Sequence, residues 1–137
     1  MQQITIRSFE GSDICVRSPS ELAAALKALS AEHRHEPLLI YLYGESGNVM
    51  IFGIGAAHTT IELIAGDRHF RSLGSTPPAP ESIPFIFQGE LTEVEPKYLI
   101  SQADGERAAL AWFEGRGLDD TIAWRDDPFP PRSGSGR

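Results

Sequence analysis

Residues 83–127, IPFIFQGELTEVEPKYLISQADGERAALAWFEGRGLDDTIAWRDD, contain the clearest structural signals in the chain. An apolar strand opens this stretch, and an acidic turn and an extended segment follow it. Ser101 with Asp104 predicts the start of a helix near 102–115, in which alanines and large aromatic residues share one face. Two glycines end that helix, and a final strand is expected over Thr121–Trp124.

The preceding part of the chain reads as a series of strands around one further helix. Ser18 can cap that helix, Pro19 suits its first position, and Glu21 completes a capping box, which predicts a helix near 19–34. Strands are expected over residues 2–9, 14–16, 38–43, 49–54, 59–65 and 68–73. Strands interrupted by only two helices predict an α+β fold, a single domain over 1–127 with a mainly antiparallel sheet.

Composition sets the broad class of the protein. A chain of 137 residues favours one domain. No apolar run of about 18 residues exists, and the N-terminal residues MQQITIRSFEG lack a basic region followed by an apolar core. We therefore expect no membrane span, no signal peptide and a cytoplasmic location. Residues 128–137, PFPPRSGSGR, are expected to form a flexible tail.

The net charge of −7 is concentrated in one region, because residues 81–127 carry 11 acidic side chains against 4 basic ones. Such a field repels nucleic acid and attracts a basic partner. Direct binding to nucleic acid is disfavoured further, since no Lys/Arg cluster is long enough to follow a phosphate backbone. The simplest alternative is an acidic face that only interacts with solvent.

Signatures of catalysis and of metal or cofactor binding are weak. Cys15 lies in an apolar Ile-Cys-Val triplet, which predicts a buried and inert thiol. His33 and His35 lack further ligands at metal-binding spacing, and no nucleotide or phosphate fingerprint occurs. Glu93 and Glu95 would share one environment in an extended segment, whereas an acid–base pair needs two different environments. We expect a protein that is not an enzyme and holds no cofactor or metal.

One motif carries a resemblance to a known family. A strand ending at Gly89 is followed by Glu93, Pro96, the helix from Ser101 and a strand bearing Trp124. This order resembles the first-numbered immunity-protein family of bacterial polymorphic toxin systems, over about a third of the chain. The resemblance implies a protein that binds a cognate toxin and covers its active-site cleft. The toxins are commonly nucleic-acid deaminases, as in the pairing with the double-stranded-DNA cytosine deaminase toxin.

The candidate toxin contacts are the acidic residues of this region, because carboxylates can mimic phosphates to a basic groove and loops tolerate such charge. Trp124 is included, although a core position against Trp112 and Phe113 is the stronger interpretation for it, and Glu93 could be a buried turn residue. The candidates are Glu90, Glu93, Glu95, Asp119, Asp120, Trp124, Asp126 and Asp127. A small-ligand-binding or enzymatic α+β domain is the alternative, and a structural adaptor with another basic partner is a third possibility.

Overall fold

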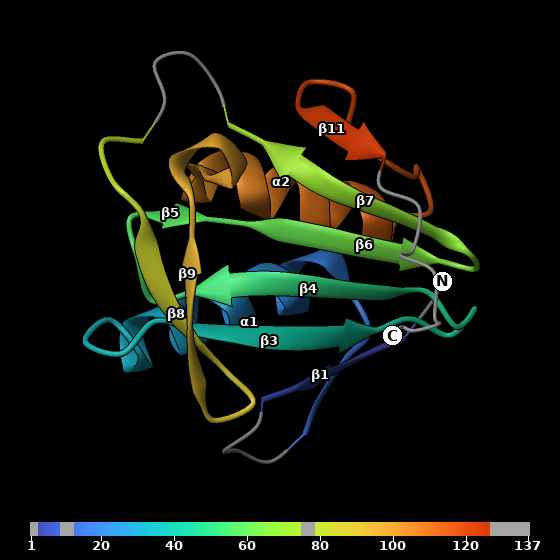
Figure 1. Ribbon diagram of the computed structural model, residues 1–137. Helices are drawn as coiled ribbons and strands as arrows, with labels where there is room; N and C mark the ends of the chain where they lie inside the picture. Colours follow the sequence, from blue (N-terminus) through green and yellow to red (C-terminus); the bar gives the residue numbers. More distant parts are fainter. Residues whose placement is uncertain (1–2, 9–12, 75–78, 127–137) are drawn as a thin grey trace, which may run out of the picture.

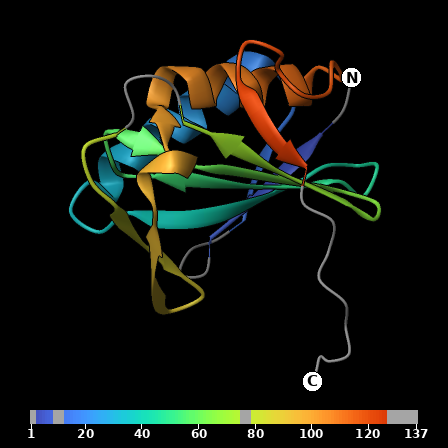
Figure 2. The ribbon, with the colours of Figure 1, turned by 45° about the horizontal axis from the view of Figure 1, so that its top comes forward.

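The computed structural model describes residues 3–8, 13–74 and 79–126, which form a twisted sheet with two helices on one face (Figures 1 and 2). The helices are α1 (Pro19–Glu32) and α2 (Gln102–Phe113). The main sheet contains β1 (Ile4–Arg7), β2 (Ile14–Val16), β3 (Leu38–Tyr43), β4 (Val49–Ile54), β6 (Ile61–Ala65), β7 (Arg68–Leu73), β8 (Ile83–Phe87), β9 (Glu90–Val94) and β11 (Ala123–Asp126). Two short strands, β5 (His58–Thr59) and β10 (Ile100–Ser101), pair separately, and η1 (Pro96–Tyr98) is a 3-10 turn.

The sheet confirms the predicted α+β class. Its path runs β11-β7-β6-β4-β3-β1-β2, and β8 joins β3 and carries β9. Every described pairing is antiparallel except that of β3 with β8. Neither described helix is long and apolar enough to cross a membrane.

The helix α1 begins where its capping residues predict. The Ser18 hydroxyl accepts a hydrogen bond from the Glu21 backbone N–H (3.1 Å), and the Glu21 carboxylate accepts one from the Arg17 backbone N–H (2.7 Å). The carboxylate therefore satisfies the donor one residue before the cap, rather than that of Ser18 itself. Leucines spaced along the helix bury its inner face, and the helix ends at Glu32, two residues before the predicted end; the leucines are Leu22, Leu26 and Leu29.

The helix α2 lies close to the strands β5 and β4 at Gly105. Ser101 caps it by accepting a hydrogen bond from the Asp104 backbone N–H (3.1 Å). A Cβ atom on Gly105 would lie 2.4 Å from the Thr59 side chain, so only glycine permits this approach. The predicted inner face is confirmed as buried, and it comprises Ala108, Ala109, Trp112 and Phe113.

Two predicted strands have different bounds in the structure. The strand predicted over 59–65 is divided into β5 and β6. The Thr59 hydroxyl both donates to the Gly53 carbonyl (2.6 Å) and accepts from the Gly53 N–H (3.1 Å), and β5 pairs away from the main sheet with β10. The last strand begins at Ala123 rather than Thr121, because hydrogen bonds to Asp119 hold Thr121 in a turn.

The prediction for Cys15 was wrong, because its thiol is exposed. The residue lies on β2, an edge strand that pairs only with β1 among the described strands. Val16, the next residue, points to the opposite face and is buried in the core. The predicted tail over 128–137 lies outside the described residues.

The sheet face opposite the helices is only partly covered. The hairpin β8–β9 and the turn η1 lie over one end of this face, and Figure 2 shows the hairpin on the side away from α1 and α2. A second apolar cluster fills the space beneath them, made of Leu39, Ile51, Ala79, Phe85, Val94, Tyr98 and Leu99. We call the remaining part of this surface the open face.

Candidate interaction site

The hairpin β8–β9 joins the strand ladder of the main sheet through one residue pair. Ile86 pairs with Leu38 of β3, and its backbone N–H donates to the Pro37 carbonyl (2.8 Å). Gln88 and Gly89 both have left-handed backbone angles (φ 54° and 85°), as the tight turn of a two-residue hairpin requires. Among the described strands β9 pairs only with β8, so its outer edge is free.

The outer face of β9 combines an exposed apolar side chain with an acidic one. Leu91 is 71% exposed, and it is the only large hydrophobic side chain so exposed in the described part of the chain. Glu93 lies two residues further along β9, on the same face as Leu91. Glu90 and Glu93 are exposed and form no ion pair with any described residue, whereas Glu95 pairs with Lys97 (3.6 Å). The exposure of Glu93 contradicts the alternative in which it is a buried turn residue.

Asp119 lies in a different environment. Its side chain is 8% exposed and accepts hydrogen bonds from Arg107 Nε (3.0 Å), the Thr121 backbone N–H (3.0 Å) and the Thr121 hydroxyl (2.8 Å). Burial alone would raise the pKa of Asp119, but the hydrogen bonds from Thr121 and the charge of Arg107 outweigh it and hold the pKa below its usual range. This carboxylate stabilises the turn before β11 and presents little surface to a partner.

Trp124 also belongs mainly to the fold. Its ring is half-buried and packs against the core cluster that contains Trp112 and Phe113. Its indole Nε1 donates to the Asp119 carbonyl (2.9 Å), which satisfies the polar atom of the ring. The core position that the sequence favoured for Trp124 agrees with this geometry.

The remaining candidates lie near β11. Asp120 is exposed and forms no hydrogen bond or ion pair with the described residues, and Asp126 pairs with Arg68. Asp127 lies outside the described residues. In the sheet, β11 is separated from β8 and β9 by β7, β6, β4 and β3, and Figure 1 shows β9 and β11 far apart. The candidate residues therefore form two separate groups rather than one surface.

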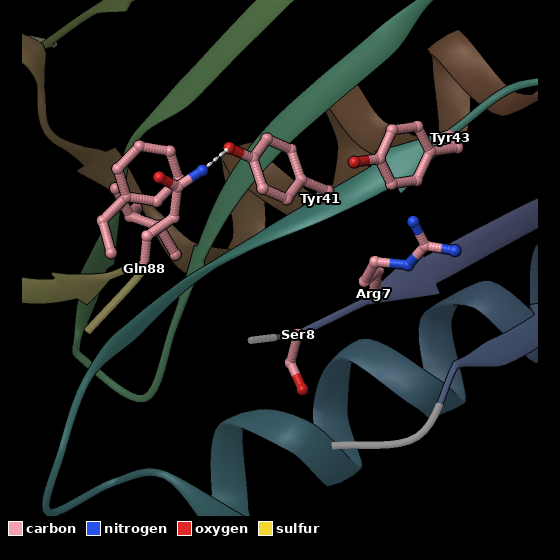
Figure 3. A pocket seen from close by; sticks show the side chains of 7 residues that line it. Arg7, Ser8, Tyr41, Tyr43 and Gln88 are labelled. Carbon is pink, nitrogen blue, oxygen red and sulfur yellow. Dashed lines mark hydrogen bonds between the residues drawn. The ribbon is translucent and has the colours of Figure 1, made fainter. Parts of the chain in front are cut away.

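A pocket of about 200 Å³ opens next to the hairpin, and sequence reasoning missed it (Figure 3). It forms because β1 and β8 pair with opposite ends of the same edge of β3, leaving a gap between them. Its walls are Arg7, Ser8, Leu39, Tyr41, Tyr43, Phe87 and Gln88. The only available signal was the alternation in LLIYLY, which places both tyrosines of β3 on one face.

The pocket is aromatic and its charge is balanced. The rings of Tyr41 and Tyr43 stack with centroids 5.6 Å apart, and Phe87 lies 5.6 Å from Tyr41. Arg7 lies 5.2 Å from the Tyr43 ring, but its guanidinium is paired with Asp13 (2.8 Å). That pairing raises the pKa of Arg7 and lowers the pKa of Asp13, so the two charges largely cancel.

The hydroxyl of Tyr41 has a partner at the rim of the pocket. It accepts a hydrogen bond from Gln88 Nε2 (2.5 Å), drawn in Figure 3, and burial raises the pKa of Tyr41. Pockets for drug-sized ligands measure about 300–1,000 Å³, so this smaller one has room for a single side chain or a small planar group.

The described residues contain no group of three or more His, Cys, Asp or Glu side chains that could hold a metal ion. Comparison with protein families finds no family model that matches the chain, and no curated protein matches it either. Within the described residues, the hairpin thus combines a free strand edge, an exposed leucine and glutamates without ion pairs, and it lies beside an aromatic pocket.

Proposed function

We propose that this protein is an immunity protein that binds and neutralises a cognate bacterial toxin, a nucleic-acid deaminase whose substrate base is cytosine in DNA. It acts without catalysis by covering the active-site cleft of the toxin. The resemblance of residues 83–125 to an immunity-protein family supports this assignment. The structural observation that carries it is the hairpin β8–β9, with its free edge and its exposed Leu91.

An exposed strand edge bearing a large apolar side chain is a liability that proteins usually conceal. On β9 it is retained, and a partner that covers it gives a physical reason for its presence. Burying Leu91 in a complex would contribute about 1.5–3 kcal/mol. The free backbone groups of β9 can in addition pair with an extended segment of the partner.

The charge around Leu91 suits the chemistry of such a partner. An enzyme that acts on nucleic acid binds a polyanion, so its cleft carries basic side chains. Glu90 and Glu93 are exposed and without described ion pairs, so they can approach those basic groups without breaking a contact inside this protein. The net charge of −7 would also speed association with a basic partner at low salt.

Co-expression tests the proposal. The protein should protect cells from the toxin encoded beside it and should copurify with the toxin domain. The double variant Leu91→Arg/Glu93→Lys should weaken that complex at least tenfold and reduce protection, because it removes the apolar contact and reverses a complementary charge. Glu32→Lys, an exposed charge reversal at the end of α1, is the matched control and should bind normally. An unmodified protein that neither binds nor neutralises the toxin would refute the proposal.

A second candidate function has one observation in its favour. The aromatic pocket favours a small-ligand-binding domain, with a planar group seated on Tyr41 and Tyr43. Its volume of about 200 Å³ ranks this candidate lower, since it is below the range for most metabolite-sized ligands. The same co-expression experiment distinguishes the immunity function from small-ligand binding, because a protein that only binds a small ligand leaves the toxin active.

A further inference from the structure

The aromatic pocket on the open face is built as a platform with one wall. Tyr41 and Tyr43 lie two residues apart on β3, and their rings stack with centroids 5.6 Å apart and an angle of 26° between their planes. Phe87 lies 5.6 Å from Tyr41 and is tilted by 50°, so it closes one side. Such a platform suits a flat group, and a volume of about 200 Å³ has room for one side chain.

One end of this platform already holds a guanidinium group. The guanidinium carbon of Arg7 lies 5.2 Å from the centroid of the Tyr43 ring, and Figure 3 shows Arg7 beside Tyr43 and Gln88 beside Tyr41. Arg7 donates to both oxygens of Asp13, from Nε (3.0 Å) and from Nη2 (2.8 Å), so its charge is largely balanced inside the protein. Among the described residues no cationic group lies over Tyr41, which leaves this end of the platform open to a second flat group.

An acidic side chain without an ion pair lies beside the wall of the pocket. Glu90 on β9 is the cross-strand partner of Phe87, so the two side chains leave the hairpin on the same face and lie next to each other. Glu90 is exposed and forms no ion pair with a described residue. Burial is the main cause that raises the pKa of Tyr41, and the charge of Glu62 adds to it. Negative charge therefore surrounds the end of the platform that Arg7 does not occupy.

We propose that this pocket receives an arginine side chain of the toxin, whose guanidinium stacks on Tyr41 and pairs with Glu90. The inference rests on the proposed function and names the chemistry of the partner group. A guanidinium is planar, stacks on aromatic rings and donates to carboxylates, so it matches the platform and the acid together. The basic side chains expected in a cleft that binds nucleic acid supply such a group. The net charge of −7 favours its approach.

Two other occupants match only part of the pocket. An aromatic side chain would lie on the same platform, but it would leave Glu90 without a charged partner. A lysine ammonium would pair with Glu90, but it is a compact charge without the flat surface and the forked donors of arginine. Three probes separate these occupants, namely the N-acetyl amides of arginine, lysine and phenylalanine.

Each probe is titrated into the intact chain while NMR follows the ring signals of Tyr41 and Tyr43. The arginine probe should shift these signals saturably and bind about threefold tighter than either other probe, because it alone makes both contacts. Glu90→Gln should weaken arginine binding about threefold, as expected for an exposed ion pair, and leave phenylalanine binding unchanged. Glu32→Gln, which neutralises an exposed acid at the end of α1, is the matched control and should change neither.

Variants of Tyr41 test the stacking contact. Tyr41→Leu should abolish binding of the arginine probe, whereas Tyr41→Phe keeps the ring and should retain binding within about twofold. In the complex with the toxin, Tyr41→Leu should weaken binding about tenfold and Glu90→Gln about threefold. If Tyr41→Leu fails to fold, the three probes and the comparison of Glu90→Gln with Glu32→Gln decide the question.

Three results would overturn the assignment: no saturable shift with the arginine probe, binding of the lysine or phenylalanine probe as tight as that of arginine, or equal effects of Glu90→Gln and Glu32→Gln. The titration contains no toxin, so its failure leaves the immunity function intact when the parent still protects cells. Binding of the arginine probe by a protein that gives no protection would refute the immunity function but not the arginine site.

Discussion

Glu93 on β9 and Asp119 before β11 come from the same acidic stretch, yet the structure places them in opposite environments. Asp119 is buried and accepts hydrogen bonds from Arg107 and Thr121. Glu93 is exposed on a free strand edge beside Leu91. The difference shows that an acidic segment contains two kinds of carboxylate: those surrounded by donors stabilise the fold, and those without donors are available to a partner.

Removal of the Asp119 carboxylate should produce the largest difference in stability between the two regions. Asp119→Ala should lower the free energy of unfolding by about 1.5–3 kcal/mol, because it removes charge-assisted hydrogen bonds and leaves Arg107 and Thr121 without their shared acceptor. Denaturant unfolding measures the change. Asp120→Ala, the exposed neighbour, is the control and should stay within about 0.5 kcal/mol of the parent. Equal effects from both substitutions would show that burial of Asp119 contributes nothing.

Low pH should remove the stability that the ionised Asp119 carboxylate provides. The pKa of Asp119 is lowered in the folded state, so its ionised form adds stability at every pH above the unfolded value of about 3.9. As the pH falls through the folded pKa, the carboxylate becomes protonated and that stability is lost. The difference in unfolding free energy between the parent and Asp119→Asn should therefore be largest near neutral pH and should narrow below about pH 3.9. A difference that stays constant down to pH 2 would contradict the ionic origin.

The smallest effect on stability is expected in the hairpin. Glu90→Lys/Glu93→Lys should change the free energy of unfolding by less than about 0.5 kcal/mol, because both side chains are exposed and neither forms an ion pair with a described residue. Thermal and denaturant melts measure this change, alongside Asp119→Ala as the positive control. A loss of 1.5 kcal/mol or more would mean that the hairpin carboxylates stabilise the fold, and the comparison between the two regions would no longer hold.

Much of the fold was predictable because its signals act over a few residues. Ser18 and Ser101 both cap helices through the backbone N–H three residues ahead, and a cap of this kind is visible in the sequence itself. The run of residues 38–43 predicted a central strand, and β3 has neighbours on both edges. The strand predicted over 59–65 failed because the hydrogen bonds of Thr59 to Gly53 depend on a strand elsewhere in the chain.

The candidate site was only partly predictable. Glu90 and Glu93 are exposed, as a contact surface requires. The residues next to them in the sequence did not predict that the outer edge of β9 is free. Asp119 and Asp120 are adjacent and identical in type, but one is buried and the other exposed. The pocket could not be predicted from the sequence, because its walls come from β1, β3 and the tip of β8–β9, which are distant in the chain.

By itself, the sequence determined the α+β class, the two helix starts and the acidic bias, since capping, periodicity and charge are properties of neighbouring residues or of composition. Only the tertiary structure decided that Cys15 is exposed, that Asp119 is held by Arg107, and that Arg71 stacks on Tyr98. The physical reason is strand register. A side chain's burial and partners depend on which distant strand lies beside it, and local patterns do not contain that information.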